Sequence, residues 1–174
     1  MTTLASATVT STAAPAAFFA QWADMASWPE WNLDTEWVRL DGPFAEGATG
    51  VLKPKGGPKV PFTVARLVDG EEFTDVSRLL GARLTFQHLV TVDAGKTAVS
   101  VEVSLTGPLA PLWRLILGKG LRDSLRPDLD RLAARAEQVE SAQVESAQIE
   151  SAQVESAQVE SAQVESAQQA DAGR

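Results

Sequence analysis

The side chain best suited to acid–base chemistry is His88, the one histidine of the chain. It alternates in phase with apolar residues, which places it on the apolar face of a predicted strand with Leu84, Phe86, Val90 and Val92. An imidazole titrates near neutral pH and can give, take or hold a proton. Two interpretations stay open: a residue that lines a ligand pocket, and a core imidazole satisfied by a backbone carbonyl or a hydroxyl.

Asp75 is the second candidate, on the strand predicted to precede that of His88. Alternation does not decide which face it occupies. An inward Asp75 would hold His88 in one tautomer and complete a catalytic acid–base pair. An outward Asp75 would form a surface ion pair with Arg66 or Arg78, which contributes little to stability. The outward orientation is the one we expect.

Bulky apolar residues supply candidate walls for a pocket around His88. The predicted ligand-binding set is His88, Phe86, Phe62, Phe73, Trp113 and Leu117. Aromatic residues at such spacing form a core more often than they contact a ligand, so a packed interior remains the alternative.

Short strand-like runs must position these residues. They are 4–10, 35–40, 48–55, 59–68, 72–80, 83–92 and 97–106. Turn-forming residues separate consecutive runs from Asp41 onward, and this spacing is typical of antiparallel hairpins. After the first run, helix-start residues predict one short helix, and 27–34 predicts an ordered loop or a second one. The expected sheet therefore has six or seven strands and one apolar face.

One long helix follows, predicted from Leu109 to Glu137. Its apolar stripe consists of Leu109, Leu112, Trp113, Ile116, Leu117, Leu121, Leu125, Leu129, Leu132 and Ala136. We expect this stripe to be the surface around which the sheet wraps. Pro127 predicts a kink, and Gly118 and Gly120 indicate either close packing or room for a ligand.

Composition excludes several classes of function. The net charge is −8, of which residues 139–174 contribute −6, from seven acidic residues and one arginine. There is no cysteine, one histidine and no basic stripe, so we expect no disulfide, no metal site, no cofactor and no nucleic-acid partner. No apolar run is long enough for a membrane span. The N-terminus has no basic segment before an apolar one, and we expect a cytoplasmic protein.

The last part of the chain repeats VESAQ six times, once as IESAQ. A five-residue step turns an α-helix by a net ~140°, so the valines form no continuous seam. We expect two parts: a folded domain of residues 1–138, and an acidic low-complexity tail, 139–174, disordered or transiently helical.

The folded part resembles the polyketide cyclase/dehydrase-like proteins of the SRPBCC superfamily. The resemblance covers about residues 4–138 and rests on the order of elements and on four segments: WPEW at 28–31, FAEGATGVLKPKGGPK at 44–59, LTFQH at 84–88 and LTGPLAPLWRLILG at 105–118. It implies an α+β helix-grip fold, in which the sheet wraps around the C-terminal helix and encloses a deep cavity. It also implies a START-like binder of lipids or other hydrophobic molecules.

Three functions fit these features. The first is a monomeric or homodimeric protein that holds an apolar or aromatic ligand between sheet and helix. The second is an aromatase/cyclase-like enzyme in which His88 moves protons on a polyketide-like substrate. The third is an interaction protein whose own side chains fill the cavity. Fold alone does not choose among them.

Overall fold

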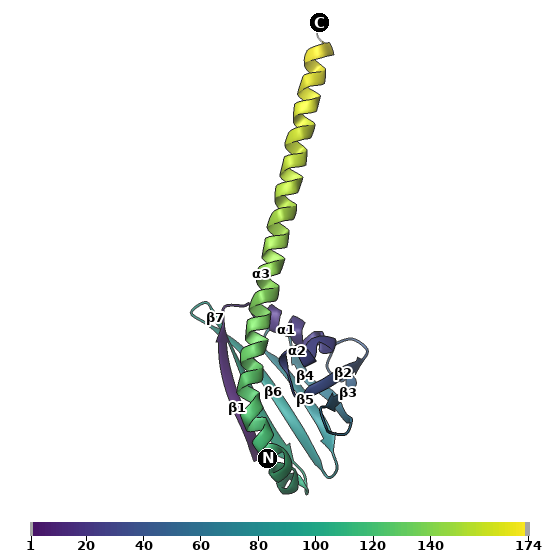
Figure 1. The fold of residues 1–174 in the computed structure, drawn as a ribbon, viewed down its shortest axis with the longest axis vertical. Helices are drawn as coiled ribbons and strands as arrows, with labels where there is room; N and C mark the ends of the chain where they lie inside the picture. Colours follow the sequence, from purple (N-terminus) through teal and green to yellow (C-terminus); the bar gives the residue numbers. More distant parts are fainter. Residues whose placement is uncertain (1, 173–174) are drawn as a thin grey trace. The chain divides into compact units, whose positions relative to one another are not determined.

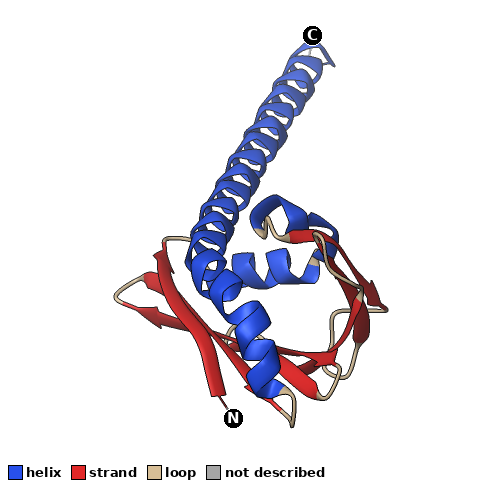
Figure 2. Ribbon diagram, turned by 60° about the horizontal axis from the view of Figure 1, so that its bottom comes forward, coloured by secondary structure: helices blue, strands red, loops and turns tan. Residues whose placement is uncertain are grey.

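The computed structural model describes the backbone of residues 2–172 and the side chains of residues 2–156 and 158. The chain divides into two units, Met1–Glu137 and Gln138–Arg174. The first is an antiparallel sheet with three helices, and the second is helical wherever it is described. Figures 1 and 2 show the elements.

The sheet of the first unit has seven strands in the order β1-β7-β6-β5-β4-β3-β2. The strands are β1 (Thr2–Ser11), β2 (Thr35–Asp41), β3 (Thr49–Pro54), β4 (Val60–Val68), β5 (Glu72–Leu79), β6 (Ala82–Asp93) and β7 (Lys96–Thr106). From β2 to β7 each strand pairs with the next, and β1 closes the order by pairing with β7. Every predicted strand is present.

Two short helices connect β1 to β2, as expected. They are α1 (Pro15–Ala23) and α2 (Trp28–Trp31), joined by a 3₁₀ turn, Met25–Ser27. Pro15 and Pro29 stand at the helix starts, where the missing N–H costs no intrahelical bond. Phe18 and Trp22 are fully enclosed, so α1 contributes a large part of the core.

The third helix, α3, spans Ala110–Ala172 and belongs to both units. Within the first unit it crosses the concave face of the curved sheet (Figure 2). Leu125, Leu129, Leu132 and Ala136 are buried there. The α+β helix-grip fold expected from the sequence is therefore confirmed.

The predicted apolar stripe of α3 is wrong at Leu109, Leu112 and Ile116, which are exposed, whereas Trp113 and Leu117 are partly buried against the core. Leu112 is 50% exposed and Ile116 57%, whereas Leu132 is fully buried. The physical reason is local: residues 109–117 are apolar on almost every side of the helix, so periodicity alone cannot decide which side faces the sheet. Pro127 lies inside α3, and the helix continues through it.

Hydrogen bonds from residues 131–137 of α3 hold this segment of the helix against the rest of the first unit. The Glu137 carboxylate accepts hydrogen bonds from the Ser11 hydroxyl at 2.7 Å and the Thr12 amide at 2.9 Å. The Arg131 guanidinium donates to the Trp31 carbonyl at 2.9 Å, and Arg135 donates to the Gln21 side chain at 2.6 Å. These bonds and the buried leucines hold α3 against β1, α1 and α2.

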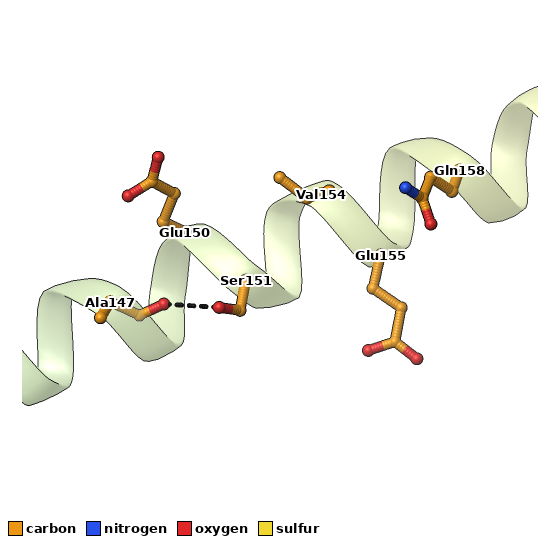
Figure 3. A pocket seen from close by; sticks show the side chains of 6 residues that line it. All are labelled: Ala147, Glu150, Ser151, Val154, Glu155 and Gln158. Carbon is orange, nitrogen blue, oxygen red and sulfur yellow. Dashed lines mark hydrogen bonds between the residues drawn. The ribbon is translucent and has the colours of Figure 1, made fainter.

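The second unit is described as helix up to Ala172, and residues 173–174 of the predicted tail lie outside the described residues. Val144, Ile149 and Val154 are each more than half exposed. Figure 3 shows a shallow surface on this helix, bordered by Ala147, Glu150, Ser151, Val154, Glu155 and Gln158, with the Ser151 hydroxyl donating to the Ala147 carbonyl. A single helix encloses no ligand, so this surface is not a candidate site.

Candidate functional site

Two titratable side chains lie on the concave face of the sheet, on the neighbouring strands β5 and β6. The register pairs Phe73 with His88 and Asp75 with Phe86. Phe73, Asp75 and Ser77 therefore share one face of β5 with Phe86 and His88 of β6. Asp75 and His88 are diagonal neighbours, and this places two titratable groups within one apolar surface.

His88 lies deep in the first unit, yet it keeps partial exposure. Its Nδ1 is 3.0 Å from the carbonyl oxygen of Phe73. A carbonyl can only accept, so we assign the proton to Nδ1, and Nε2 of the neutral ring is then a free acceptor. This bond supplies the backbone partner that the core interpretation requires, and it uses only one of the two ring nitrogens.

Nε2 of His88 has no hydrogen-bond partner among the described residues. The fully enclosed side-chain polar atoms without a partner, in the same part of the chain, are the indole nitrogens of Trp22 and Trp31. Nε2 is not one of them, so it is accessible. An accessible acceptor in a ring otherwise enclosed by protein is suited to a hydrogen bond from a bound molecule.

Asp75 is buried, with 7% of its surface exposed. The expectation of an outward Asp75 is thus wrong: Arg66 pairs instead with Glu72 at 2.6 Å, and Arg78 is on the opposite face of β5. The carboxyl group of Asp75 forms no ion pair among the described residues. The reason is register, because pairing with β6 turns Asp75 to the same side as Phe73.

Burial shifts the two titratable groups in opposite directions. It lowers the pKa of His88 to about 4, against the smaller opposing effect of the hydrogen bond to Phe73. It raises the pKa of Asp75 to about 7, against the smaller effect of a backbone hydrogen bond. Both shifts favour the uncharged form, as expected for groups removed from water. At neutral pH the face offers a neutral imidazole and a carboxyl group close to half protonated.

Aromatic rings surround His88. Its ring stacks on Phe73 with centroids 4.9 Å apart and planes at 14°, and Trp22 is 5.1 Å away. Trp28 and Phe44 also contact Phe73. No sequence pattern links Trp22, Trp28 or Phe44 to the site, because α1, α2 and the β2–β3 loop are far from β6 in the chain.

The other residues predicted to bind a ligand differ in burial. Phe62 and Phe73 are buried members of the core, and Phe86, Trp113 and Leu117 are partly buried against it. The Trp113 indole donates to the Leu80 carbonyl at 2.9 Å, which ties it to the β5–β6 turn. Phe86 is on the same face as His88, next to Asp75 in the register. Their role as ligand contacts stays a prediction.

No group of three or more metal-ligating side chains occurs among the described residues. Over the same residues, no helix is both long and apolar enough to cross a membrane.

Comparison with known proteins agrees with this architecture. The sheet that curves around a C-terminal helix is the fold of the SRPBCC superfamily. The chain belongs to the family described as polyketide cyclase/dehydrase and lipid transport, whose model matches residues 2–137. A search of curated proteins gives no significant match.

Several solved structures share the fold at low sequence identity. A hypothetical protein from Helicobacter pylori, jhp0584, has a TM-score of 0.62 at 12% identity, over 76% of this chain and 86% of its own. A START superfamily protein from Mycobacterium smegmatis has a TM-score of 0.57 at 16% identity, over 77% and 97%. The di-domain ARO/CYC protein StfQ of the steffimycin biosynthetic pathway has a TM-score of 0.63 at 13% identity, over 78% and 51%. At these identities the likeness concerns the fold.

Proposed function

We propose that the protein binds an apolar or aromatic small molecule that carries a hydroxyl group, between the concave face of the sheet and α3. The observation that carries the proposal is the accessible Nε2 of His88, an acceptor within an enclosed aromatic surface. Apolar walls with few polar groups are typical of ligand sites. A cytoplasmic location and a monomeric or homodimeric state accompany this proposal as predictions.

The chemistry of the face supports one class of ligand. Phe86 and Leu117 are partly buried and present apolar surface. Nε2 of His88 accepts a hydrogen bond, and a protonated Asp75 donates one. A flat apolar molecule with a hydroxyl group, or with adjacent hydroxyl and carbonyl groups, satisfies both. Permanently charged ligands are disfavoured because burial already favours the uncharged form of both protein groups.

The test is a ligand-observed NMR titration with two probes, 1-naphthol and 1-methylnaphthalene, which differ mainly in the hydroxyl group. We expect wild-type protein to bind both and to prefer 1-naphthol. His88→Phe keeps the bulk and deletes the acceptor, so the preference should fall by roughly 2- to 12-fold, the value of one hydrogen bond. Leu89→Phe is the matched control, because Leu89 is the next residue of β6 and is 41% exposed.

Failure of the wild-type protein to bind either probe would contradict the proposal. So would an unchanged preference in a folded His88→Phe variant. Native mass spectrometry of freshly purified protein gives an independent readout, since a co-purified small molecule would appear as a mass difference.

One observation favours an enzymatic alternative. Asp75 and His88 are diagonal neighbours on one face, and the pKa of Asp75 is close to neutral. A group with such a pKa transfers protons efficiently at that pH. In an aromatase/cyclase-like reaction, Asp75 would act as the acid and His88 as the base on a bound polyketide-like substrate. Asp75→Asn would then abolish turnover and leave ligand binding intact.

A further inference from the structure

We propose that the end of the first unit formed by the β5–β6 turn and the first two turns of α3 docks on the surface of an anionic phospholipid bilayer. The contact residues of this docking end are Leu80, Leu109, Leu112, Leu115 and Ile116. This surface is separate from the concave face, so the proposal does not depend on the ligand-binding function.

The docking end concentrates exposed apolar side chains. Five of the eight large apolar residues exposed in the described part of the first unit belong to it. Leu80 is 80% exposed and Leu115 is 82% exposed. Leu112, Leu115 and Ile116 are neighbours on the helix surface at spacings of three and four residues. Contiguous exposed apolar surface marks a site of association.

Hydrogen bonds join the two segments of the docking end, the β5–β6 turn and the start of α3. The Leu109 amide donates to the Gly81 carbonyl at 3.0 Å, and the Trp113 indole donates to the Leu80 carbonyl at 2.9 Å. A Cβ added at Gly81, which has φ +64°, would approach the Leu109 side chain to 2.7 Å. These contacts hold the turn and the helix start together, so their leucines belong to one surface.

Positive charge surrounds these leucines. Residues 76–92 and 103–122 contain no acidic residue, in a chain with a net charge of −8. Arg78, Arg83, Arg114 and Arg122 are exposed and form no ion pair within the described residues. Lys119 differs, because it pairs with Asp123 at 2.5 Å.

Arg78 and Arg83 are the most informative of these cations. They are directly opposite one another across β5 and β6. Like charges at such a position repel and destabilise the pair of strands. They lie on the convex face, so they flank the docking end on the side away from α3. An anionic surface below the turn would relieve their repulsion, since long arginine side chains can reach along the strand axis.

The topology separates charge between the two ends of the sheet. In an antiparallel meander, alternate connections lie at the same end. The β3–β4 connection shares the end of the β5–β6 turn and adds Lys55 and Lys59. The connections at the opposite end carry the acidic residues Glu46, Asp69 and Glu71, and Asp93 at the end of β6 is opposite Lys96 of β7. This asymmetry would orient the domain toward a negatively charged surface.

Acidic residues at the docking end lie away from its leucines. Asp34 and Glu36 are at the start of β2, which forms the edge of the sheet. Glu36 is neutralised by Lys53 at 3.0 Å. The charge around the β5–β6 turn itself is therefore positive.

The residue types favour a bilayer over a protein partner. Aliphatic side chains with arginine and lysine at their border are typical of segments that lie in the membrane interface. Leucine is under-represented among the residues that dominate protein–protein binding. A peripheral contact also requires no membrane-spanning helix.

The experiment is co-flotation of the full chain with vesicles of phosphatidylcholine alone, or with one quarter phosphatidylglycerol, at low and high salt. We expect partition onto the anionic vesicles that weakens as salt increases. Leu80→Ser/Leu115→Ser should weaken it at least tenfold. Arg114→Gln/Arg122→Gln should weaken it roughly 20- to 30-fold at low salt, because each cation near such a surface contributes about a factor of five.

The matched controls come from elsewhere in the first unit. Val92→Ser removes a 62% exposed apolar side chain near the opposite end, and Arg39→Gln removes an arginine whose side chain is 68% exposed. Both should bind vesicles as wild type does. Near-UV circular dichroism checks that every variant is folded.

Three results would overturn the proposal: no binding of wild type to anionic vesicles, equal losses in the controls, or full binding by the Leu80→Ser/Leu115→Ser variant. Analytical ultracentrifugation tests the other occupant. A wild-type dimer that this variant dissolves, without vesicle binding by the wild type, would assign the surface to a second copy of the chain.

Discussion

The substitution Asp75→Asn should make the protein more stable, and increasingly so as the pH rises. Burial raises the pKa of Asp75 from 3.8 to about 7. Between these values the folded state holds a proton that the unfolded state has released, so stability falls as pH rises and is fully retained only below about 3.8. The shift of about 3 units corresponds to a loss on the order of 4 kcal/mol at and above pH 7. An asparagine side chain cannot ionise, so the variant escapes this loss.

The assay is urea unfolding of wild type and Asp75→Asn from pH 4 to pH 8, followed by tryptophan fluorescence. The difference between the two proteins isolates Asp75, since other titrating groups cancel. His88 illustrates the need for the difference: its pKa is lowered to about 4, so it adds stability as pH rises from 4 to 6.5, in the opposite direction. The difference in unfolding free energy should be small near pH 4, grow steadily between pH 4 and pH 7, and reach a few kcal/mol by pH 8. A difference independent of pH would refute the burial of Asp75.

Three further predictions concern His88, the helix and the tail. His88→Phe should fold normally and still bind 1-methylnaphthalene, and a collapsed near-UV dichroism signal would assign His88 to the core. Leu132→Ala, at a fully buried position, should lower the free energy of unfolding by about 2–5 kcal/mol. Leu117→Ala, at a partly buried position, should lower it by about 2 kcal/mol or less. Equal losses of unfolding free energy in urea would show that Leu117 is fully packed. Truncation after Gln138 should leave the Tm nearly unchanged, because the described tail residues beyond Glu140 are exposed. A fall in the calorimetric Tm of more than about 4 °C would show that the tail packs against the first unit.

The strand that carries His88 was predictable because its alternation is clean. Leu84, Phe86 and Val90 mark one face of β6, and the pairing with β7 runs without a bulge. This alternation of apolar and polar residues is enough to predict that His88 faces inward. Its hydrogen bond to Phe73 depends on the register with β5, which the sequence does not encode locally.

Asp75 was not predictable for a related reason. Both faces of β5 mix apolar and polar residues: Phe73, Asp75 and Ser77 on one side, Thr74 and Val76 on the other. No alternation of hydrophobicity then exists to choose a face. Only the pairing with β6 decides it, and that pairing is a tertiary property.

The long helix shows the opposite difficulty. Residues 109–117 carry so many apolar side chains that any helical phase yields a stripe. The sequence thus predicts the helix correctly and the burial of its start wrongly. The side chains that were expected in the core, Leu112 and Ile116, are the ones the structure exposes.

The state of the His88 ring tests the ligand-binding account most directly. Because the chain has one histidine, ¹⁵N labelling of histidine gives the signals of a single imidazole. The account predicts a neutral Nδ1–H tautomer at pH 7 that does not titrate until about pH 4, and an upfield shift of Nε2 alone when 1-naphthol is added. A ring that titrates near its ordinary pKa of 6.5, or an Nε2 signal unmoved at saturating 1-naphthol, would contradict it.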